Sequence, residues 1–223
     1  MTRRRFVVRN LFWFGAALLM MGGPCGAPST EEPPDGGSNG NGGSKPPPPV
    51  VTSCGLLGNN CSTPVGQQPS ALELLDLDRD GDLDIVVANA GADTLWVIRN
   101  DGNGKFTHIQ TLSGGDMPTA MAAGDFDRDG LRDLAVCSLV DGVGITISTL
   151  FNNGNLTFTV GDSYPIGGVA TFATAADLDG DNDLDLITVN EYTNTISLLP
   201  NEKGVFGAAV NLTTGRRPRA VVA

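Results

Sequence analysis

The chain has 223 residues, of which 25 are acidic and 14 are basic, so its formal net charge at pH 7 is −11. A surface with this excess of negative charge repels a phosphate backbone, which argues against nucleic acid as a partner. Of the 25 acidic residues, 14 lie in three short loops, so most of the acidity is concentrated at particular places.

Residues 1–27 have the character of an export signal. Arginines at Arg3–Arg5 precede the apolar stretch Leu11–Met21, which is shorter than the roughly 20 residues of a membrane-spanning helix. The Thr-Arg-Arg-x-Phe start is similar to a twin-arginine signal, and a general secretory leader accounts for the same residues. Cys25 leaves two outcomes open, a lipid anchor in a membrane or a freely secreted protein. Either way we expect an exported protein that is extracellular, periplasmic or on the cell surface.

The next two segments differ from both the leader and the remainder of the chain. Residues 28–51 are rich in Pro, Gly, Ser and Asn and predict a disordered linker. Residues 52–65 form a short segment in which Cys54 and Cys61 bracket a few residues. In an exported protein a nearby pair of this kind predicts a local disulfide. Residues 66–223 contain the repeats.

An acidic loop occurs three times in this last region. The copies are DLDRDGDLD at residues 76–84, DFDRDGLRD at 125–133 and DLDGDNDLD at 177–185. Carboxylates at positions 1, 3, 5 and 9 of one loop repel each other unless a cation neutralises them, and a hard divalent ion takes about six to eight oxygen ligands. Position 6 is Gly81, Gly130 or Asn182, residue types that tolerate the positive φ of a sharp turn. The loops therefore predict about three Ca²⁺ sites.

Each acidic loop has the same place in a unit of predicted β-strands. A short strand precedes the loop, a strand buried on both faces follows it, and a second apolar strand ends in a turn of Asn and Gly before a Phe. The segments are Ser70–Leu75, Ile85–Ala88, Leu95–Ile98 and Asn100–Phe106; then Ala120–Ala123, Leu134–Cys137, Ile145–Ile147 and Asn152–Phe158; then Leu186–Val189, Ile196–Leu199 and Asn201–Phe206. A period of about 50 residues with four strands per unit predicts an all-β fold made of β-propeller blades.

The unit Asp-x-Asp-x-Asp-Gly-x-x-Asp, apolar strand, Asn-x-Gly-x-x-x-Phe resembles the FG-GAP/VCBS-type repeat. That family includes the calcium-binding blades of integrin α-subunit propellers and many exported bacterial proteins. The resemblance covers residues 66–223 and implies calcium ligation by the side chains at positions 1, 3, 5 and 9 and by the backbone carbonyl at position 7. The implied side-chain ligands are Asp76, Asp78, Asp80 and Asp84; Asp125, Asp127, Asp129 and Asp133; and Asp177, Asp179, Asp181 and Asp185. The implied carbonyl ligands are those of Asp82, Leu131 and Asp183. Asn182 departs from the Gly of the family pattern.

The end of the chain resembles the start of another unit. Pro69 and Pro118 each precede an acidic loop by seven residues, and Pro218–Ala223 has the same character. The sequence thus predicts three four-stranded blades plus the start of a fourth. Propellers close with about four to eight blades, so we expect an incomplete propeller. Two accounts stay open: a piece of a longer chain whose further blades act in cis, or a short protein that associates in trans or stays open.

No catalytic set is evident in the sequence. His108 lies in an alternating stretch and is expected to face solvent, and Cys137 is expected to be a small core residue. The family motif marks a scaffold, so we expect a non-catalytic domain in adhesion, recognition or scaffolding, with a protein or glycan as ligand. Two alternatives stay open: a carbohydrate-binding propeller that uses Trp96, and the accessory propeller of a secreted polysaccharide-active enzyme whose catalytic part lies elsewhere.

Overall fold

The structure is a computed structural model of the whole chain. It describes residues 63–103, 105–140 and 144–222. The regular secondary structure of these residues is entirely β, and none of them belongs to a helix that could span a membrane. The expected export signal (1–27), the expected linker (28–51) and the expected Cys54–Cys61 disulfide lie outside the described residues.

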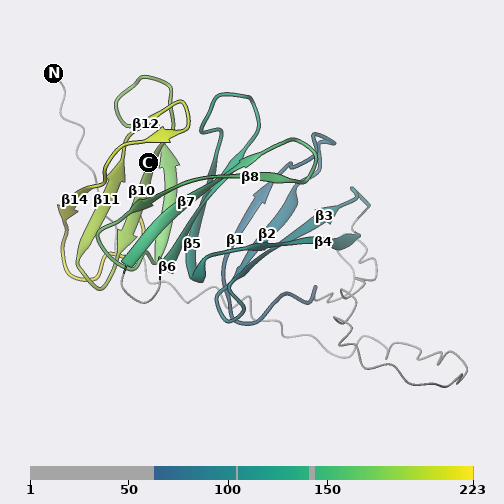
Figure 1. The fold of residues 1–223 in the computed structure, drawn as a ribbon, viewed down its shortest axis with the longest axis horizontal. Helices are drawn as coiled ribbons and strands as arrows, with labels where there is room; N and C mark the ends of the chain where they lie inside the picture. The colour runs from purple at the N-terminus through teal and green to yellow at the C-terminus, as the bar shows by residue number, and fades with distance from the viewer. Residues whose placement is uncertain (1–62, 104, 141–143, 223) are drawn as a thin grey trace, which may run out of the picture.

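The strands form three four-stranded antiparallel sheets and one two-stranded hairpin (Figure 1). Sheet 1 consists of β1 (Pro69–Leu75), β2 (Asp84–Asn89), β3 (Thr94–Asn100) and β4 (Phe106–Ser113). Sheet 2 consists of β5 (Asp116–Gly124), β6 (Asp133–Val140), β7 (Gly144–Asn152) and β8 (Phe158–Pro165). Sheet 3 consists of β9 (Phe172–Ala176), β10 (Asp185–Asn190), β11 (Thr195–Leu199) and β14 (Val210–Thr213). The separate hairpin consists of β12 (Asn201–Glu202) and β13 (Val205–Phe206). The predicted all-β fold and its three four-stranded units are confirmed.

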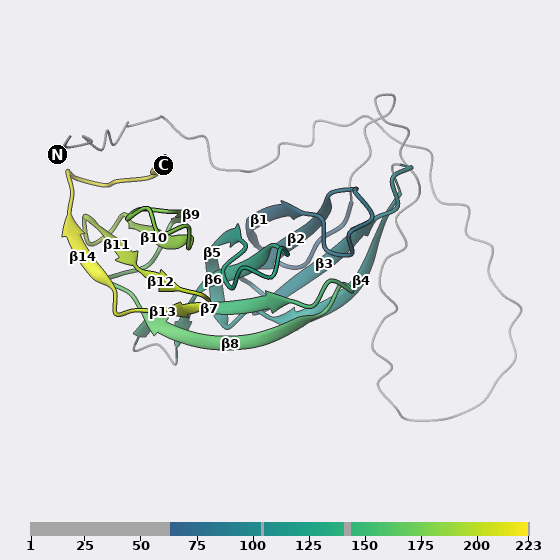
Figure 2. The ribbon, with the colours of Figure 1, turned by 90° about the horizontal axis from the view of Figure 1, so that it is seen from above.

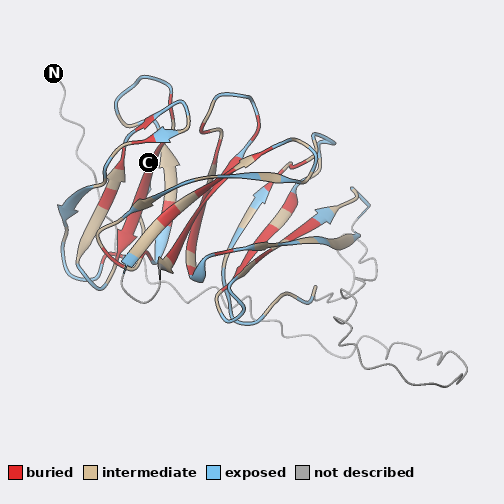
Figure 3. Ribbon diagram, in the orientation of Figure 1, coloured by how far each residue is buried: buried red, intermediate tan, exposed pale blue. Residues whose placement is uncertain are grey.

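The second strand of each sheet is the most deeply buried, as its continuous apolar run predicts. All six residues of β10 are buried, with Leu186 packed toward sheet 2 and Ile187 on the opposite face. Figure 3 shows that buried residues concentrate in strands such as β2, β6 and β10, whereas β14 and many of the loops are exposed. A strand buried on both faces needs apolar residues at every position, which is why these runs lack alternation.

The sheets pack against one another through their first strands. β1 contacts β5, and β5 contacts β9 (Figure 2). One apolar cluster joins sheets 1 and 2, with Leu75 and Val97 of sheet 1 packed with Met121 and Leu134 of sheet 2. A second cluster, which includes Phe126, joins sheets 2 and 3. Adjacent propeller blades have this relation, although the described residues do not close a ring.

Pro218–Val222, the expected start of a fourth unit, form no strand. The equivalent strands β1 and β5 pair with the strand that follows their acidic loop, and the described residues contain no such partner for Pro218–Val222. The turn that leads into this segment nevertheless repeats the turn at the start of β5. Arg217 (φ 50°) donates its N–H to Asn194, as Met117 (φ 43°) donates its N–H to Asp93.

Two further side chains can be compared with expectation. Cys137 is fully buried in the core, as expected, and desolvation raises the pKa of its thiol to about 12. The expectation for His108 is wrong: its ring is half-buried and stacks on Trp96 with centroids 4.2 Å apart. A bulge pairs Ile98 with His108 rather than with Ile109, and this shift of one residue moves the imidazole to the face that carries Trp96.

Candidate metal centres

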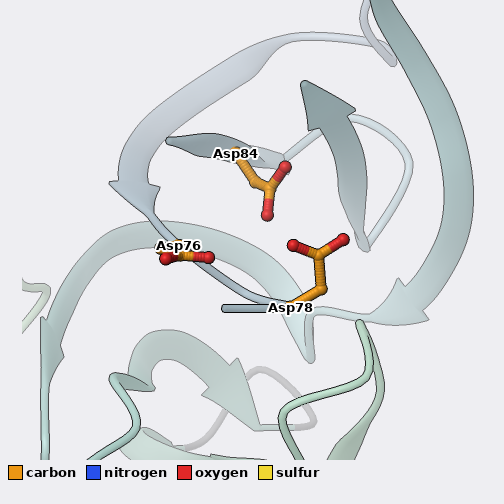
Figure 4. A group of neighbouring side chains, drawn as sticks. All are labelled: Asp76, Asp78 and Asp84. Carbon is orange, nitrogen blue, oxygen red and sulfur yellow. The ribbon is translucent and has the colours of Figure 1, made fainter. Parts of the chain in front are cut away.

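Each of the three acidic loops brings three carboxylates together. The groups are Asp76, Asp78 and Asp84; Asp125, Asp127 and Asp133; and Asp177, Asp179 and Asp185. In each group one oxygen per residue lies within 4.8 Å of the others. Calcium binds oxygens at about 2.3–2.6 Å, so two ligands on opposite sides of one ion lie about 5 Å apart. The first group is shown in Figure 4, and its spacing fits a single cation.

A repeated set of hydrogen bonds gives each loop its shape. The position-1 carboxylate accepts the N–H of position 6, and the position-3 carboxylate accepts the N–H of position 5. In the first loop these bonds run from Gly81 to Asp76 at 3.1 Å and from Asp80 to Asp78 at 3.3 Å. Equivalent bonds occur in the second and third loops. Because the donors are backbone groups of the same loop, each loop presents its carboxylates in the same way.

The predicted ligands at positions 5 and 7 lie outside these three groups. The position-5 carboxylates accept the N–H of position 7, in the pairs Asp82 to Asp80 at 2.9 Å, Leu131 to Asp129 at 2.7 Å and Asp183 to Asp181 at 2.8 Å. At position 7, the Leu131 side chain is buried and Asp183 forms an ion pair with Arg128 of the second loop. Ligation through positions 5 and 7 stays a prediction.

The position-9 carboxylate connects its loop to the end of the third strand. Asp84 is fully buried, and its two oxygens accept the N–H groups of Leu77 at 3.0 Å and Asn100 at 2.8 Å. Asp133 accepts from Phe126 and Asn152, and Asp185 accepts from Leu178 and Asn201, at 2.8 to 2.9 Å. Position 9 therefore has a structural role in addition to any metal ligation, which the spacing of the acids alone does not reveal.

Apart from Oδ1 of Asp183, which is ion-paired with Arg128, two oxygens in the loops are buried without a hydrogen-bond partner. They are Oδ1 of Asp76 and Oδ1 of Asp125, at position 1 of the first and second loops. A buried carboxylate oxygen of this kind is costly unless a donor or a cation satisfies it. In the third loop the equivalent oxygen of Asp177 is exposed and accepts the N–H of Gly180 at 2.7 Å. The donor set and the two orphan oxygens fit a divalent cation.

The electrostatics of the loops also favour a bound cation. Burial raises the pKa of Asp133 to about 6, and the neighbouring carboxylates of Asp127 and Asp129 add to this effect. Backbone hydrogen bonds to Asp133 oppose the rise without cancelling it. Burial also raises the pKa of Asp84 and of Asp127. The ionised loop is thus costly by itself, and a bound dication reverses that balance.

The backbone of each loop turns twice through positive φ. At position 6 the values are 90° for Gly81, 85° for Gly130 and 68° for Asn182, which confirms the expectation. At position 4 they are 64° for Arg79, 65° for Arg128 and 90° for Gly180, a second turn that the acidic pattern alone does not predict. The available signal was Gly180, because glycine in one copy of a repeat indicates a conformation that the other copies must also adopt.

The third loop is the most open of the three. A cleft of about 590 Å³ separates it from the β12–β13 hairpin, and its lining includes Asp181, Glu202 and Lys203. The hairpin turns toward the second loop instead, since a Cβ on Gly204 would lie 3.1 Å from Cβ of Asp127. The third metal position is therefore the most accessible to solvent.

Comparison with known proteins supports the resemblance drawn from the motifs. Residues 76–136 match the FG-GAP-like repeat, from the first residue of the first acidic loop into β6. The fold is similar to the crystal structure of a functionally unknown protein from Desulfotomaculum acetoxidans DSM 771, with a TM-score of 0.52 and 17% sequence identity. That similarity covers 76% of this chain and 55% of the other, so this chain spans about half the length of that structure. No curated protein matches the chain in sequence.

Proposed function

Since residues 76–136 carry an FG-GAP-like repeat, we propose that the chain is a non-catalytic, calcium-binding repeat domain of an exported bacterial protein. The observation that carries this proposal is the threefold recurrence of the same carboxylate group at the same place in each sheet. Each group lies where the first strand of a sheet leads into the second, so a bound ion holds that connection closed. The sheets are blades of a propeller-type array.

The domain acts in adhesion, recognition or scaffolding, with a protein or a glycan as its ligand. The support for this role is the family resemblance together with the export character of residues 1–27. The metal acts first on stability, because neutralising the clustered carboxylates removes the repulsion within each loop. Calcium concentrations outside cells suit weak sites of this kind, with dissociation constants of about 10⁻⁴ to 10⁻³ M in extracellular modules.

Calcium titration by calorimetry tests the metal part of the proposal. We expect about three equivalents to bind. Asp78→Asn, Asp127→Asn and Asp179→Asn should each remove about one equivalent, because position 3 makes only a local hydrogen bond besides its proposed metal contact. The matched control is Asp162→Asn, an exposed carboxylate in β8 outside the loops, which should keep all equivalents. Absence of calcium binding by the folded protein would overturn the proposal.

A further inference from the structure

A chain of hydrogen bonds connects the second acidic loop to the third across the junction of sheets 2 and 3. Asn201, whose residue is 5% exposed, lies at its centre. The N–H of Asn201 donates to Asp185 of the third loop at 2.8 Å, and its Nδ2 donates to the carbonyl oxygen of Phe126 in the second loop at 2.8 Å. Phe126 in turn donates its own N–H to Asp133 at 2.9 Å. Buried hydrogen bonds thus join the position-9 carboxylates of the two loops.

Further contacts cross the same junction. Arg128 of the second loop forms an ion pair with Asp183 and donates to the carbonyl oxygen of Asp181. Gly204 of the β12–β13 hairpin lies against Asp127, since a Cβ at this glycine would come within 3.1 Å of Cβ of that residue. The second and third loops are therefore held by each other as well as by their own sheets.

The junction of sheets 1 and 2 lacks an equivalent connection. Asn152 occupies the place of Asn201 in sheet 2, and its N–H donates to Asp133 in the same way. Its Nδ2, however, is buried and has no hydrogen-bond partner in the described part of the chain. The carbonyl oxygen of Leu77, at position 2 of the first loop, instead accepts the N–H of Leu156 at 3.4 Å, beyond the usual range of about 2.7–3.2 Å. The side-chain amide that joins the second and third loops therefore has no counterpart between the first and second.

We propose that Asn201 is a positioning residue that couples the second and third calcium sites, so that these two bind as a pair and the first site binds independently. This inference rests on the proposed function, because it concerns the ions bound there. An ion held by Asp185 fixes the N–H donor of Asn201, and with it the amide that holds the carbonyl of Phe126. That carbonyl belongs to the peptide group that leads into Asp127, a proposed ligand of the second site. The first ion to bind therefore orders parts of both loops, and the second loses less conformational entropy on binding.

Repulsion between the two bound ions works against this coupling, but the charges of the loops limit it. Residues 177–185 contain five aspartates and no basic residue, so the third loop stays negative with one dication bound. Residues 125–133 contain four aspartates and two arginines, so the second loop becomes neutral. Salt at 0.15 M screens charges over about 8 Å. Neither loaded loop thus becomes a positively charged neighbour, and the shared hydrogen bonds decide the sign of the coupling.

Calcium titration calorimetry of the full chain in 0.15 M salt tests the coupling. Asp78→Asn, Asp127→Asn and Asp179→Asn each remove one site, and their three double combinations each leave a single site. For each pair of sites, the association constant for binding both ions is divided by the product of the two single-site constants. We expect a ratio of about 10 for the second and third sites and about 1 for the other two pairs. Couplings between sites are typically about 5- to 150-fold, and each site affects the other equally.

Replacing the amide tests the role of Asn201 itself. Asn201→Ala keeps the N–H that donates to Asp185 but removes the donor to Phe126, so the ratio for the second and third sites should fall to about 1. The matched control is Asn152→Ala, whose amide has no such partner, and it should keep a ratio of about 10. If Asn201→Ala does not fold, Asn201→Ser repeats the test, because its hydroxyl can accept the N–H of Gly204 and it has no amide.

The outcomes separate this inference from the function on which it rests. Three bound ions with a ratio of about 1 for every pair would overturn the coupling and leave the calcium-binding function intact. The same ratio for all three pairs at any value, or an unchanged ratio in Asn201→Ala, would show that the coupling does not pass through Asn201, and would also overturn it. A folded wild-type protein that binds no calcium would instead overturn the proposed function itself.

Discussion

Arg128 Nε lies 2.5 Å from Asp183 Oδ1, and this ion pair joins the acidic loop of sheet 2 to that of sheet 3. Nη2 of Arg128 also donates to the carbonyl oxygen of Asp181 at 2.6 Å. The Asp183 side chain is 4% exposed, so the guanidinium of Arg128 compensates for the water that its carboxylate loses on burial. Arg79 occupies the same position in the first loop, but the residue equivalent to Asp183 in the second loop is Leu131. The equivalent ion pair cannot form between sheets 1 and 2.

Replacing Arg128 should therefore weaken the junction of sheets 2 and 3. We expect Arg128→Ala to lower the free energy of unfolding by about 1–2 kcal/mol in calcium, because Asp183 then stays buried without its partner. Arg79→Ala is the matched control, since it has the same loop position and positive φ without a carboxylate partner in the next loop. Urea unfolding measures both. Equal losses in the two variants would show that the ion pair contributes nothing.

The positive φ at position 4 predicts that glycine is more favourable than alanine there, whereas alanine is more favourable at an ordinary strand position. Arg79→Gly should be more stable than Arg79→Ala by about 1 kcal/mol, because only glycine adopts a φ of 64° without a steric cost from Cβ. Thermal unfolding in calcium measures the difference. The same pair of substitutions at Arg99, an exposed residue in β3 without positive φ, should reverse the order, because glycine weakens a strand. Alanine as the better residue at position 79 would contradict the prediction.

Substitutions of the position-5 and position-9 carboxylates should differ in how their effect on stability depends on calcium. Asp129→Ala or Asp80→Ala should abolish part of the rise in melting temperature that calcium produces. Asp133→Asn should destabilise the protein by about 2–4 kcal/mol even in EDTA, because its amide cannot accept from both Phe126 and Asn152. Melting curves with EDTA and with calcium separate the two effects. If Asp133→Asn matched the wild type in EDTA, position 9 would have no structural role.

The raised acid pKa values predict the pH dependence of the metal-free protein. Asp133 has a pKa of about 6 in the folded protein, and an unfolded Asp has one of about 3.9, so the folded state binds this proton more tightly. Its stabilising contribution is complete below about pH 4 and is lost as the pH rises through about 6. Burial shifts Asp84, Asp127 and Glu73 in the same direction. The free energy of unfolding in EDTA should thus fall between about pH 4 and pH 7.

Calcium should reverse this trend, because protons and calcium compete for the same carboxylates. In saturating calcium the melting temperature should be higher at about pH 7 than at about pH 5, as deprotonated ligands bind the ion more tightly. Melting curves across this range, with and without EDTA, provide the measurement. A metal-free melting temperature that climbs with pH would show that burial does not control these acids.

Much of the architecture could be predicted because it depends on local sequence patterns. Continuous apolar runs such as Leu186–Val189 identify the buried strands, and their recurrence with the acidic loops identifies three equivalent sheets. The positive φ of Asn182 also followed from its place in the loop. These features depend on residues that are close together in the chain, so the order of residue types determines them.

Other features depended on residues brought together from distant parts of the chain. The pairing of Arg128 with Asp183 spans two sheets, and only the packing of those sheets decides which loops meet. A bulge in β4 decides that His108 stacks on Trp96, and sequence alternation cannot place an inserted residue. Pro218–Val222 has the composition of an opening strand but forms none, because a strand exists only where a partner supplies its hydrogen bonds. The sequence by itself therefore determined the repeated unit and its acidic loops, and the tertiary structure decided how those units connect.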